Sequence, residues 1–286
     1  MLTSLYHKID WRVRLLRSKI ARRETNLTWS EVARGVLPTR LRPRMWLKLG
    51  VVAHHDESGT SVLWRTPVGN FWGCLGDQKD LAIVVAEQLM DVYQRGPVRI
   101  RSGDVVLDGG AHLGVFTRRA LACGARLVVA FEPEPWNAAC LRKTFASEIR
   151  AGTVVVVEAA AWKESGSLCF DGRGGTGRVV DLSRGPLAVV GATTIDATVQ
   201  RLGLERMNFI KLDIEGAEQA ALKGARETIA RFAPRMAVCV YHREEDPVVI
   251  PNCVCSSVTH YRHFFDPSGK IAYFAPAVDT CFNRQA

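Results

Sequence analysis

The sequence predicts an α/β protein built around a parallel β-sheet with helices on both faces. Two observations predict it. Apolar runs recur along the chain, at residues 105–108, 127–132, 153–160, 208–213 and 235–241. Each run is apolar at consecutive positions, which is typical of a strand buried on both faces. The segments between the runs, such as 114–125 and 135–149, have helical spacing, so strands and helices form successive βαβ units.

Three further segments flank or interrupt this alternation. Residues 61–73 predict a short hairpin that carries aromatic side chains. Residues 77–96 predict a helix closed by Gly96. Between residues 164 and 194 the pattern changes, and two apolar runs around a Gly-rich turn predict an antiparallel addition.

Length and composition favour one globular α/β domain with additions. The chain has 286 residues, of which 47% are hydrophobic and 23% charged. Its eight cysteines form no C-x-x-C pair and are expected to be buried free thiols. No apolar run approaches the ~20 residues that span a bilayer, and the N-terminus offers no continuous signal-peptide core. We therefore expect a cytoplasmic protein.

The positive charge of the chain is concentrated at its N-terminus. Residues 1–50 contain 12 Lys and Arg against 3 Asp and Glu, whereas the two kinds balance in residues 51–286. We interpret 1–50 as a basic helical extension and 51–286 as the functional domain, with a core at 97–242. Apolar residues at helical spacing mark one face of the extension: Leu5, Ile9, Val13, Leu16 and Ile20. This face either packs on the body or a partner subunit, or makes a peripheral contact with an anionic membrane.

Carboxylates stand at or near the ends of the predicted strands. Ligands of open parallel sheets bind beyond the carboxyl ends of the strands, so these positions predict a site for hydroxyl, amino or cationic groups. The strand-end residues, in order, are Asp108, Glu132, Glu158 and Asp213, followed by the pair Tyr241-His242.

The segment VVLDGGAHLG at 105–114 predicts a nucleotide site. Gly109, Gly110 and Gly114 let the backbone turn sharply and approach a ligand. Glu132 follows Asp108 by 24 residues, a spacing suited to binding both ribose hydroxyls. A dinucleotide site would share these features, but a carboxylate directly before the glycines repels pyrophosphate and attracts the ammonium group of S-adenosylmethionine. A methyl donor is therefore favoured over a nicotinamide dinucleotide.

Several segments together resemble the FkbM family of S-adenosylmethionine-dependent methyltransferases. They are VVLDGGAHLGVFTRRAL, VVAFEPEPWN, TTIDATV, FIKLDIEGAEQAALKGA and PRMAVCVYH, within residues 97–242. The resemblance implies a class I methyltransferase (Rossmann-like) fold, in which a seven-stranded mostly parallel sheet has an antiparallel last strand. It also implies methyl transfer, usually to a hydroxyl oxygen of a sugar or natural product.

The resemblance assigns roles to matching positions and leaves two gaps. It places Asp108, Gly110 and Gly114 in the donor loop and Glu132 at the ribose. The usual carboxylate after the fifth strand is replaced by Tyr241-His242, and no Asp stands at 159–161, where many methyltransferases contact adenine. Glu158 is the remaining candidate for the adenine contact.

Two residues are candidates for catalysis at a hydroxyl acceptor. His242 is the candidate general base, because an ordinary histidine pKa of ~6.5 suits proton uptake near neutrality; a structural cap of the strand end is the alternative. Asp213 is expected to orient the acceptor or assist its deprotonation. Glu215 and Glu218 are interpreted as stabilising the start of the following helix. A divalent metal held by Asp213 and neighbours is an open alternative, although the sequence names no complete ligand set.

The acceptor itself is not encoded in a recognisable motif. We expect a small-molecule or glycan acceptor, with Phe71, Trp72 and Tyr241 either lining its pocket or packing in the core. Methylation of RNA is the main enzymatic alternative, suggested by the basic extension, but the balanced charge of the body makes a nucleic-acid partner less favoured. A non-catalytic module that binds the nucleotide is the third alternative. The sequence does not define the oligomeric state.

Overall fold

The computed structural model describes residues 52–55, 61–171, 178–179, 188–258 and 261–277. The predicted helix of the basic extension, with its partner or membrane contact, lies outside these residues. Within them, no helix is both long and apolar enough to cross a bilayer.

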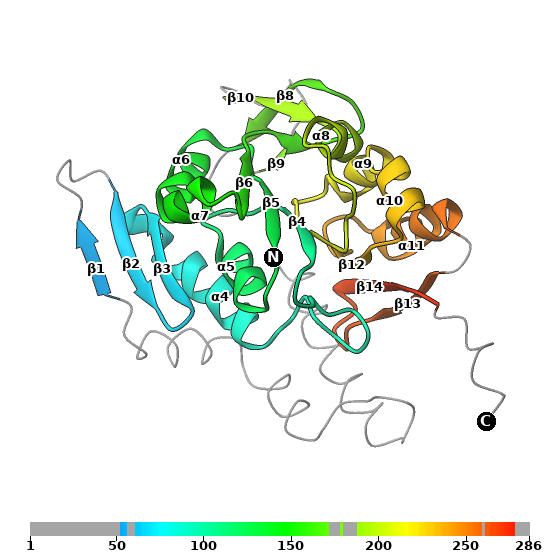
Figure 1. Ribbon diagram of the computed structural model, residues 1–286, viewed down its shortest axis with the longest axis horizontal. Helices are drawn as coiled ribbons and strands as arrows, with labels where there is room; N and C mark the ends of the chain where they lie inside the picture. Colours follow the sequence, from blue (N-terminus) through cyan, green and yellow to red (C-terminus); the bar gives the residue numbers. More distant parts are fainter. Residues whose placement is uncertain (1–51, 56–60, 172–177, 180–187, 259–260, 278–286) are drawn as a thin grey trace, which may run out of the picture.

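A seven-stranded sheet forms the centre of the molecule, in the order β13-β14-β12-β11-β4-β5-β6 (Figure 1). The five predicted strands all lie in it and pair in parallel: β4 (Val105–Gly109), β5 (Leu127–Phe131), β6 (Val154–Val157), β11 (Phe209–Leu212) and β12 (Arg235–Cys239). Strand β14 (Ile271–Pro276) is antiparallel to both β12 and β13 (Tyr261–Phe265). The predicted α/β class and its seven-stranded, mostly parallel sheet are confirmed.

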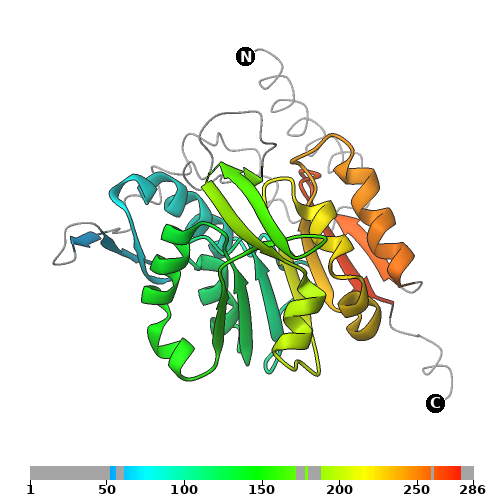
Figure 2. The same ribbon diagram turned by 90° about the horizontal axis from the view of Figure 1, so that it is seen from above.

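Helices cover both faces of this sheet (Figure 2). One face carries α5 (Val115–Ala122), α6 (Pro135–Thr144) and α7 (Ala146–Arg150), which follow β4 and β5 in the chain. The other face carries α8 (Ile195–Arg201), α9 (Glu218–Lys223), α10 (Arg226–Phe232) and α11 (Asp246–Ser257).

Strand β4 shows why its sequence is apolar at consecutive positions. Val105 and Leu107 pack in the apolar cluster that contains Ile229 of α10. Val106 points the other way, into the cluster that contains Phe116 of α5. All three β4 side chains have no exposed surface. Alternate side chains of a strand point to opposite faces, so a strand covered on both sides needs apolar residues throughout.

Two smaller sheets flank the centre, one antiparallel and one mixed. The predicted hairpin is formed by β2 (Val62–Thr66) and β3 (Gly69–Gly73), and β1 (Val52–His55) pairs with β2. The predicted antiparallel addition pairs β8 (Gly166–Asp171) with β10 (Ala188–Thr193). This second sheet also contains β7 (Ala160–Ala161) and β9 (Arg178–Val179).

The helix predicted at 77–96 ends earlier than its sequence suggests. A 3-10 turn (Leu75–Asp77) leads into α4 (Gln78–Leu89), and Asp91 then takes a left-handed φ of 51°. The Asp91 carboxylate accepts two hydrogen bonds from the Arg119 guanidinium, at 2.8 and 2.9 Å. This tertiary contact holds the turn, and the chain that follows it carries Tyr93 to the sheet edge.

Two other predicted boundaries were wrong. The helix predicted at 135–149 divides at Phe145 into α6 and α7, because Phe145 leaves helical geometry with φ −110° and ψ 27° and is fully buried. The strand predicted at 153–160 stops at Val157. Its last part becomes β7, which pairs with β10 of the second small sheet. Both breaks follow from tertiary packing, which local apolar spacing does not report.

We predict that Gly114→Ala destabilises the protein more than Gly103→Ala. Both glycines have positive φ, +88° and +85°, so alanine costs roughly 1–2 kcal/mol of backbone strain at either position. A Cβ at Gly114 would also lie 2.3 Å from Phe145 and 2.6 Å from Leu141, whereas nothing lies within 4 Å of one at Gly103. Overpacking should add ~1–3 kcal/mol at Gly114. Urea unfolding measures both losses, and equal losses would contradict this assignment.

Candidate active site

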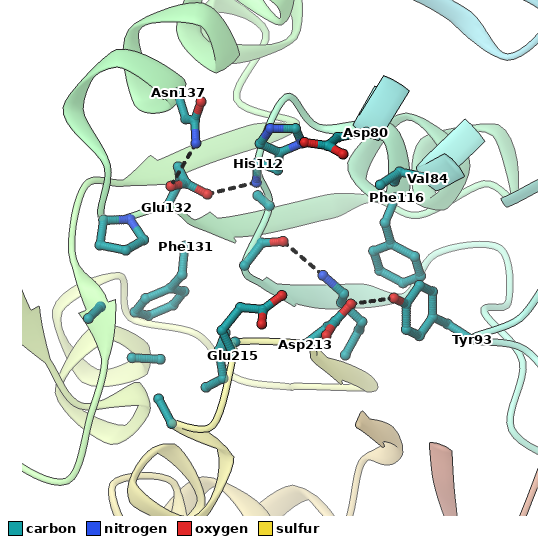
Figure 3. Close-up of a pocket in the computed structure, with 18 of the residues that line it drawn as sticks. Asp80, Val84, Tyr93, His112, Phe116, Phe131, Glu132, Asn137, Asp213 and Glu215 are labelled. Atoms are coloured by element: carbon teal, nitrogen blue, oxygen red, sulfur yellow. Dashed lines mark hydrogen bonds between the residues drawn. The ribbon is translucent and has the colours of Figure 1, made fainter. Parts of the chain in front are cut away.

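A cavity opens at the carboxyl ends of β4, β5 and β11 (Figure 3). Strand β5, which follows β4 in the chain, pairs with one edge of β4, and the later strand β11 pairs with the other edge. This reversal of strand order is where open α/β sheets bind ligands. The residues that line it are Asp80, Val84, Glu87, Gln88, Tyr93, Gly110, Ala111, His112, Phe116, Phe131, Glu132, Pro133, Asn137, Ala159, Ala160, Ala161, Phe170, Lys211, Asp213, Ile214, Glu215 and Ala217.

A buried ion pair holds the floor of this cavity. Lys211 Nζ lies 3.1 Å from Asp108 Oδ1, and the second carboxylate oxygen of Asp108 accepts from Thr117 Oγ1 at 2.7 Å. Lys211 also donates to the carbonyl oxygens of Gly109 and Gly110, at 2.9 and 2.8 Å. Burial alone lowers the pKa of Lys211, but Asp108 and Asp213 outweigh it, so the pKa is raised. Asp108 has no exposed surface, and its charge is already paired.

The glycines of this turn permit close packing as well as a sharp bend. A Cβ on Gly110, which has φ +75°, would lie 2.1 Å from the Asp213 carbonyl oxygen. A Cβ on Gly109 would lie 2.7 Å from the Leu212 side chain. Of the three predicted donor-loop glycines, Gly110 lines the cavity, whereas Gly109 packs against β11 and Gly114 against Phe145.

Glu132 stands at one end of the cavity, directly after β5. Its carboxylate accepts hydrogen bonds from the backbone N–H groups of His112, at 2.7 Å, and Glu134, at 3.0 Å. Burial nevertheless raises the pKa of Glu132 to about 7. Figure 3 shows its side chain between His112 and Asn137, on the wall of the cavity.

Asp213 and Glu215 stand at the other end, after β11. Tyr93 Oη donates to Asp213 Oδ2 at 2.6 Å. Burial raises the pKa of Asp213, but the charge of Lys211 and the Tyr93 hydrogen bond outweigh it, and the pKa is lowered. Glu87 of α4 also faces this cavity; burial and the charge of Asp213 raise its pKa to about 7.

His242 lies next to Asp213 and Glu215 but does not itself line the cavity, and 7% of its side chain is exposed. Its Nδ1 is 2.9 Å from Glu218 Oε1, and its Nε2 is 3.6 Å from Asp213 Oδ1 and 3.5 Å from Glu215 Oε2. Burial lowers the pKa of His242, but the hydrogen bond and charge of Glu218 outweigh this effect, so the pKa is raised.

The fold places the predicted site residues in three positions. Gly110, Glu132 and Asp213 line the cavity, with His242 in contact range of Asp213. Asp108, Gly109 and Gly114 are buried and do not line the cavity. Glu158 pairs with Arg142 at the surface, with 40% of its side chain exposed, and does not line the cavity.

The structure also places the other residues that the sequence analysis named. Glu218 lies in the first turn of α9, as predicted, but Glu215 precedes that helix in a left-handed turn with φ 54° and faces the cavity instead. Phe71 is fully buried in the core, and neither Trp72 nor Tyr241 lines the cavity.

Several cavity residues were not identified from the sequence. Tyr93, Glu87 and Asp80 come from the segment before β4, which carries no motif, and only the fold brings them to the sheet edge. His112 could have been identified from the sequence, because it lies between Gly110 and Gly114. In the structure it takes a left-handed φ of 51°.

The comparisons with known proteins decide the family. The sequence matches the Methyltransferase FkbM domain over residues 108–266, more than half of the chain. The chain belongs to the FkbM methyltransferase family. The family match implies methyl transfer with S-adenosylmethionine as the donor. No curated protein matches the sequence.

Solved structures share the fold at low sequence identity. A methyltransferase FkbM from Methylobacillus flagellatus is 20% identical with a TM-score of 0.50, over 71% of this chain and 55% of that chain. This chain therefore spans little more than half of that protein's length. Weaker likenesses include an rRNA methylase from Streptococcus thermophilus (11% identity, TM-score 0.39, 69% and 96% covered) and the fibrillarin pre-rRNA processing protein of Methanococcus jannaschii (11%, 0.40, 79% and 82%).

We predict that Lys211→Met destabilises the protein by ~3–5 kcal/mol, because it leaves Asp108 as an unpaired buried charge. The double variant Lys211→Met with Asp108→Asn removes both charges and should lose less. Urea unfolding of the two variants measures the difference. A double variant as unstable as the single one would show that the ion pair does not carry this stability.

Proposed function

We propose that this methyltransferase transfers the methyl group of S-adenosylmethionine to a hydroxyl oxygen of a small-molecule or glycan acceptor. The observation that carries the proposal is one cavity with Glu132 at one end and Asp213 at the other. The first end suits the ribose of the donor, and the second suits the hydroxyl of an acceptor.

The charge of the cavity supports a cationic donor. Asp80, Glu87, Glu132, Asp213 and Glu215 line it, and the buried Lys211 is the cation among the described lining residues. The sequence predicted that Asp108 attracts the donor. Because Lys211 neutralises Asp108, the lining carboxylates supply this attraction instead. A negative cavity favours a sulfonium and an ammonium group over the pyrophosphate of a dinucleotide.

The chemistry that we propose is an in-line displacement. The acceptor oxygen attacks the methyl carbon, the bond between carbon and sulfur breaks, and S-adenosylhomocysteine leaves. The hydroxyl must also release its proton. We propose that Asp213 and His242 act on this hydroxyl together: Asp213 faces the cavity, and His242 lies 3.6 Å behind its Oδ1. Tyr93 fixes the Asp213 carboxylate from the side.

Other predictions on partners and location stay open to test. Glu158 as an adenine contact, an RNA acceptor, a cytoplasmic location and a membrane contact of residues 1–50 all remain predictions. A small-molecule or glycan acceptor agrees better than RNA with a cavity that carries so many carboxylates, because these carboxylates would repel the phosphates of RNA.

The proposed reaction is tested with S-adenosylmethionine labelled in its methyl group and fractionated cell extract. We expect label in a small molecule or glycan, with mass spectrometry placing the new methyl on oxygen. Nuclease treatment of the extract is the control, and loss of labelling after that treatment would favour RNA methylation. Donor binding without any turnover would instead indicate a non-catalytic module.

We predict that donor affinity falls as the pH decreases below about 7, because Glu132 has a pKa of about 7 and must be ionised to accept both ribose hydroxyls. The Glu132→Gln variant should bind the donor at least about tenfold more weakly at pH 8, equivalent to ~1.4 kcal/mol. It should also lose most of the change between pH 8 and pH 6. Calorimetric titration measures both, with Glu164→Gln, an exposed carboxylate, as the matched control. Unchanged affinity in Glu132→Gln would remove the ribose assignment.

A further inference from the structure

Two buried polar atoms face each other behind the acceptor end of the cavity. His242 Nε2 and Asp213 Oδ1 are 3.6 Å apart, and neither has a hydrogen-bond partner within the described part of the chain. Glu215 Oε2 lies 3.5 Å from the same histidine nitrogen. These separations are longer than a hydrogen bond between nitrogen and oxygen. Buried polar atoms without a partner are rare and call for an explanation such as an ion.

The remaining atoms of these side chains are already engaged. His242 Nδ1 is 2.9 Å from Glu218 Oε1, which requires a proton on Nδ1 and leaves Nε2 of the neutral ring with a free lone pair. Tyr93 donates to Asp213 Oδ2 at 2.6 Å and leaves Oδ1 directed toward the histidine. A histidine whose second nitrogen is held by a carboxylate is the usual arrangement around a bound metal ion.

The two distances from the histidine nitrogen also match those expected around a common ion. Donor atoms of Asp213, Glu215 and His242 all lie within 4.8 Å of one another. Two ligand atoms placed ~2.1 Å from one ion at a tetrahedral angle are about 3.4 Å apart. The measured 3.5 and 3.6 Å between His242 Nε2 and the two carboxylates are close to that value.

We propose that Asp213, Glu215 and His242 form a binding site for a divalent transition-metal ion such as Mn²⁺, Co²⁺ or Zn²⁺. One imidazole nitrogen with two carboxylates suits these ions better than Ca²⁺, which prefers oxygen ligands alone. The site deepens the proposed function and rests on it for the role of the ion: Asp213 and Glu215 face the cavity, so the ion lies where the acceptor hydroxyl must release its proton. A bound divalent ion makes that release easier.

Metal binding is measured on the full chain without donor or acceptor. The protein is stripped with a chelator and titrated with Mn²⁺, while electron paramagnetic resonance reports the free ion. We expect one Mn²⁺ per chain. Glu215→Gln and His242→Gln should each weaken binding at least about tenfold. Asp80→Asn is the matched control, because it removes a carboxylate from the same cavity outside the three proposed ligands, and should bind within about threefold of wild type.

The outcomes separate this proposal from the proposed function. No Mn²⁺ binding at millimolar concentration, or equal binding by wild type and both ligand variants, would overturn the metal site, and a proton shared by His242 and the carboxylates would then be the better account. Circular dichroism of each variant checks that lost binding is not lost folding. Failure of methyl transfer to a hydroxyl, with Mn²⁺ binding intact and sensitive to Glu215→Gln, would overturn the proposed acceptor chemistry and leave the metal site standing.

Discussion

The buried contact between Lys211 and Asp108 is the interaction on which the site depends. It joins β11 to β4 at the point where the strand order reverses, and the same ammonium group binds the carbonyl oxygens of Gly109 and Gly110. An unpaired charge at this depth would be costly, so each partner fixes the position of the other. The glycine turn is thereby held against β11, with Gly110 too close to the Asp213 carbonyl for any side chain.

Pairing Asp108 with Lys211 leaves the charge of the cavity to other residues. Glu132 and Asp213 stand at its two ends, because Glu132 follows β5 and Asp213 follows β11, the strands on either side of β4. Burial raises the pKa of both carboxyl groups, but their neighbours differ. The pKa of Glu132 rises to about 7, because burial outweighs its backbone hydrogen bonds, whereas Lys211 and Tyr93 keep the pKa of Asp213 low. Glu132 can therefore change its protonation near neutral pH, while Asp213 remains a carboxylate.

One side of the cavity is built by a segment that precedes the family match, which begins at residue 108. Helix α4 supplies Asp80 and Glu87, and the turn at Asp91, held by Arg119, delivers Tyr93 to Asp213. The Tyr273 hydroxyl donates to the carbonyl oxygen of Val92 and fixes the same turn from β14. The cavity therefore combines residues from inside the family match with residues that precede it.

The sequence alone determined the strands, their parallel arrangement and the place of the glycine turn after β4, because burial on both faces and glycine turns leave local patterns. It also identified Glu132 and Asp213, since strand ends in such sheets meet at one edge. Only the tertiary structure decided which carboxylates face the cavity. Asp108 is turned inward by Lys211, Glu158 is drawn outward by Arg142, and Glu215 is placed in the cavity by a left-handed turn. The contact of Tyr93 with Asp213 joins residues that are 120 apart in the chain, and the contact of His242 with Asp213 joins residues that are 29 apart. Local spacing carries no record of such contacts.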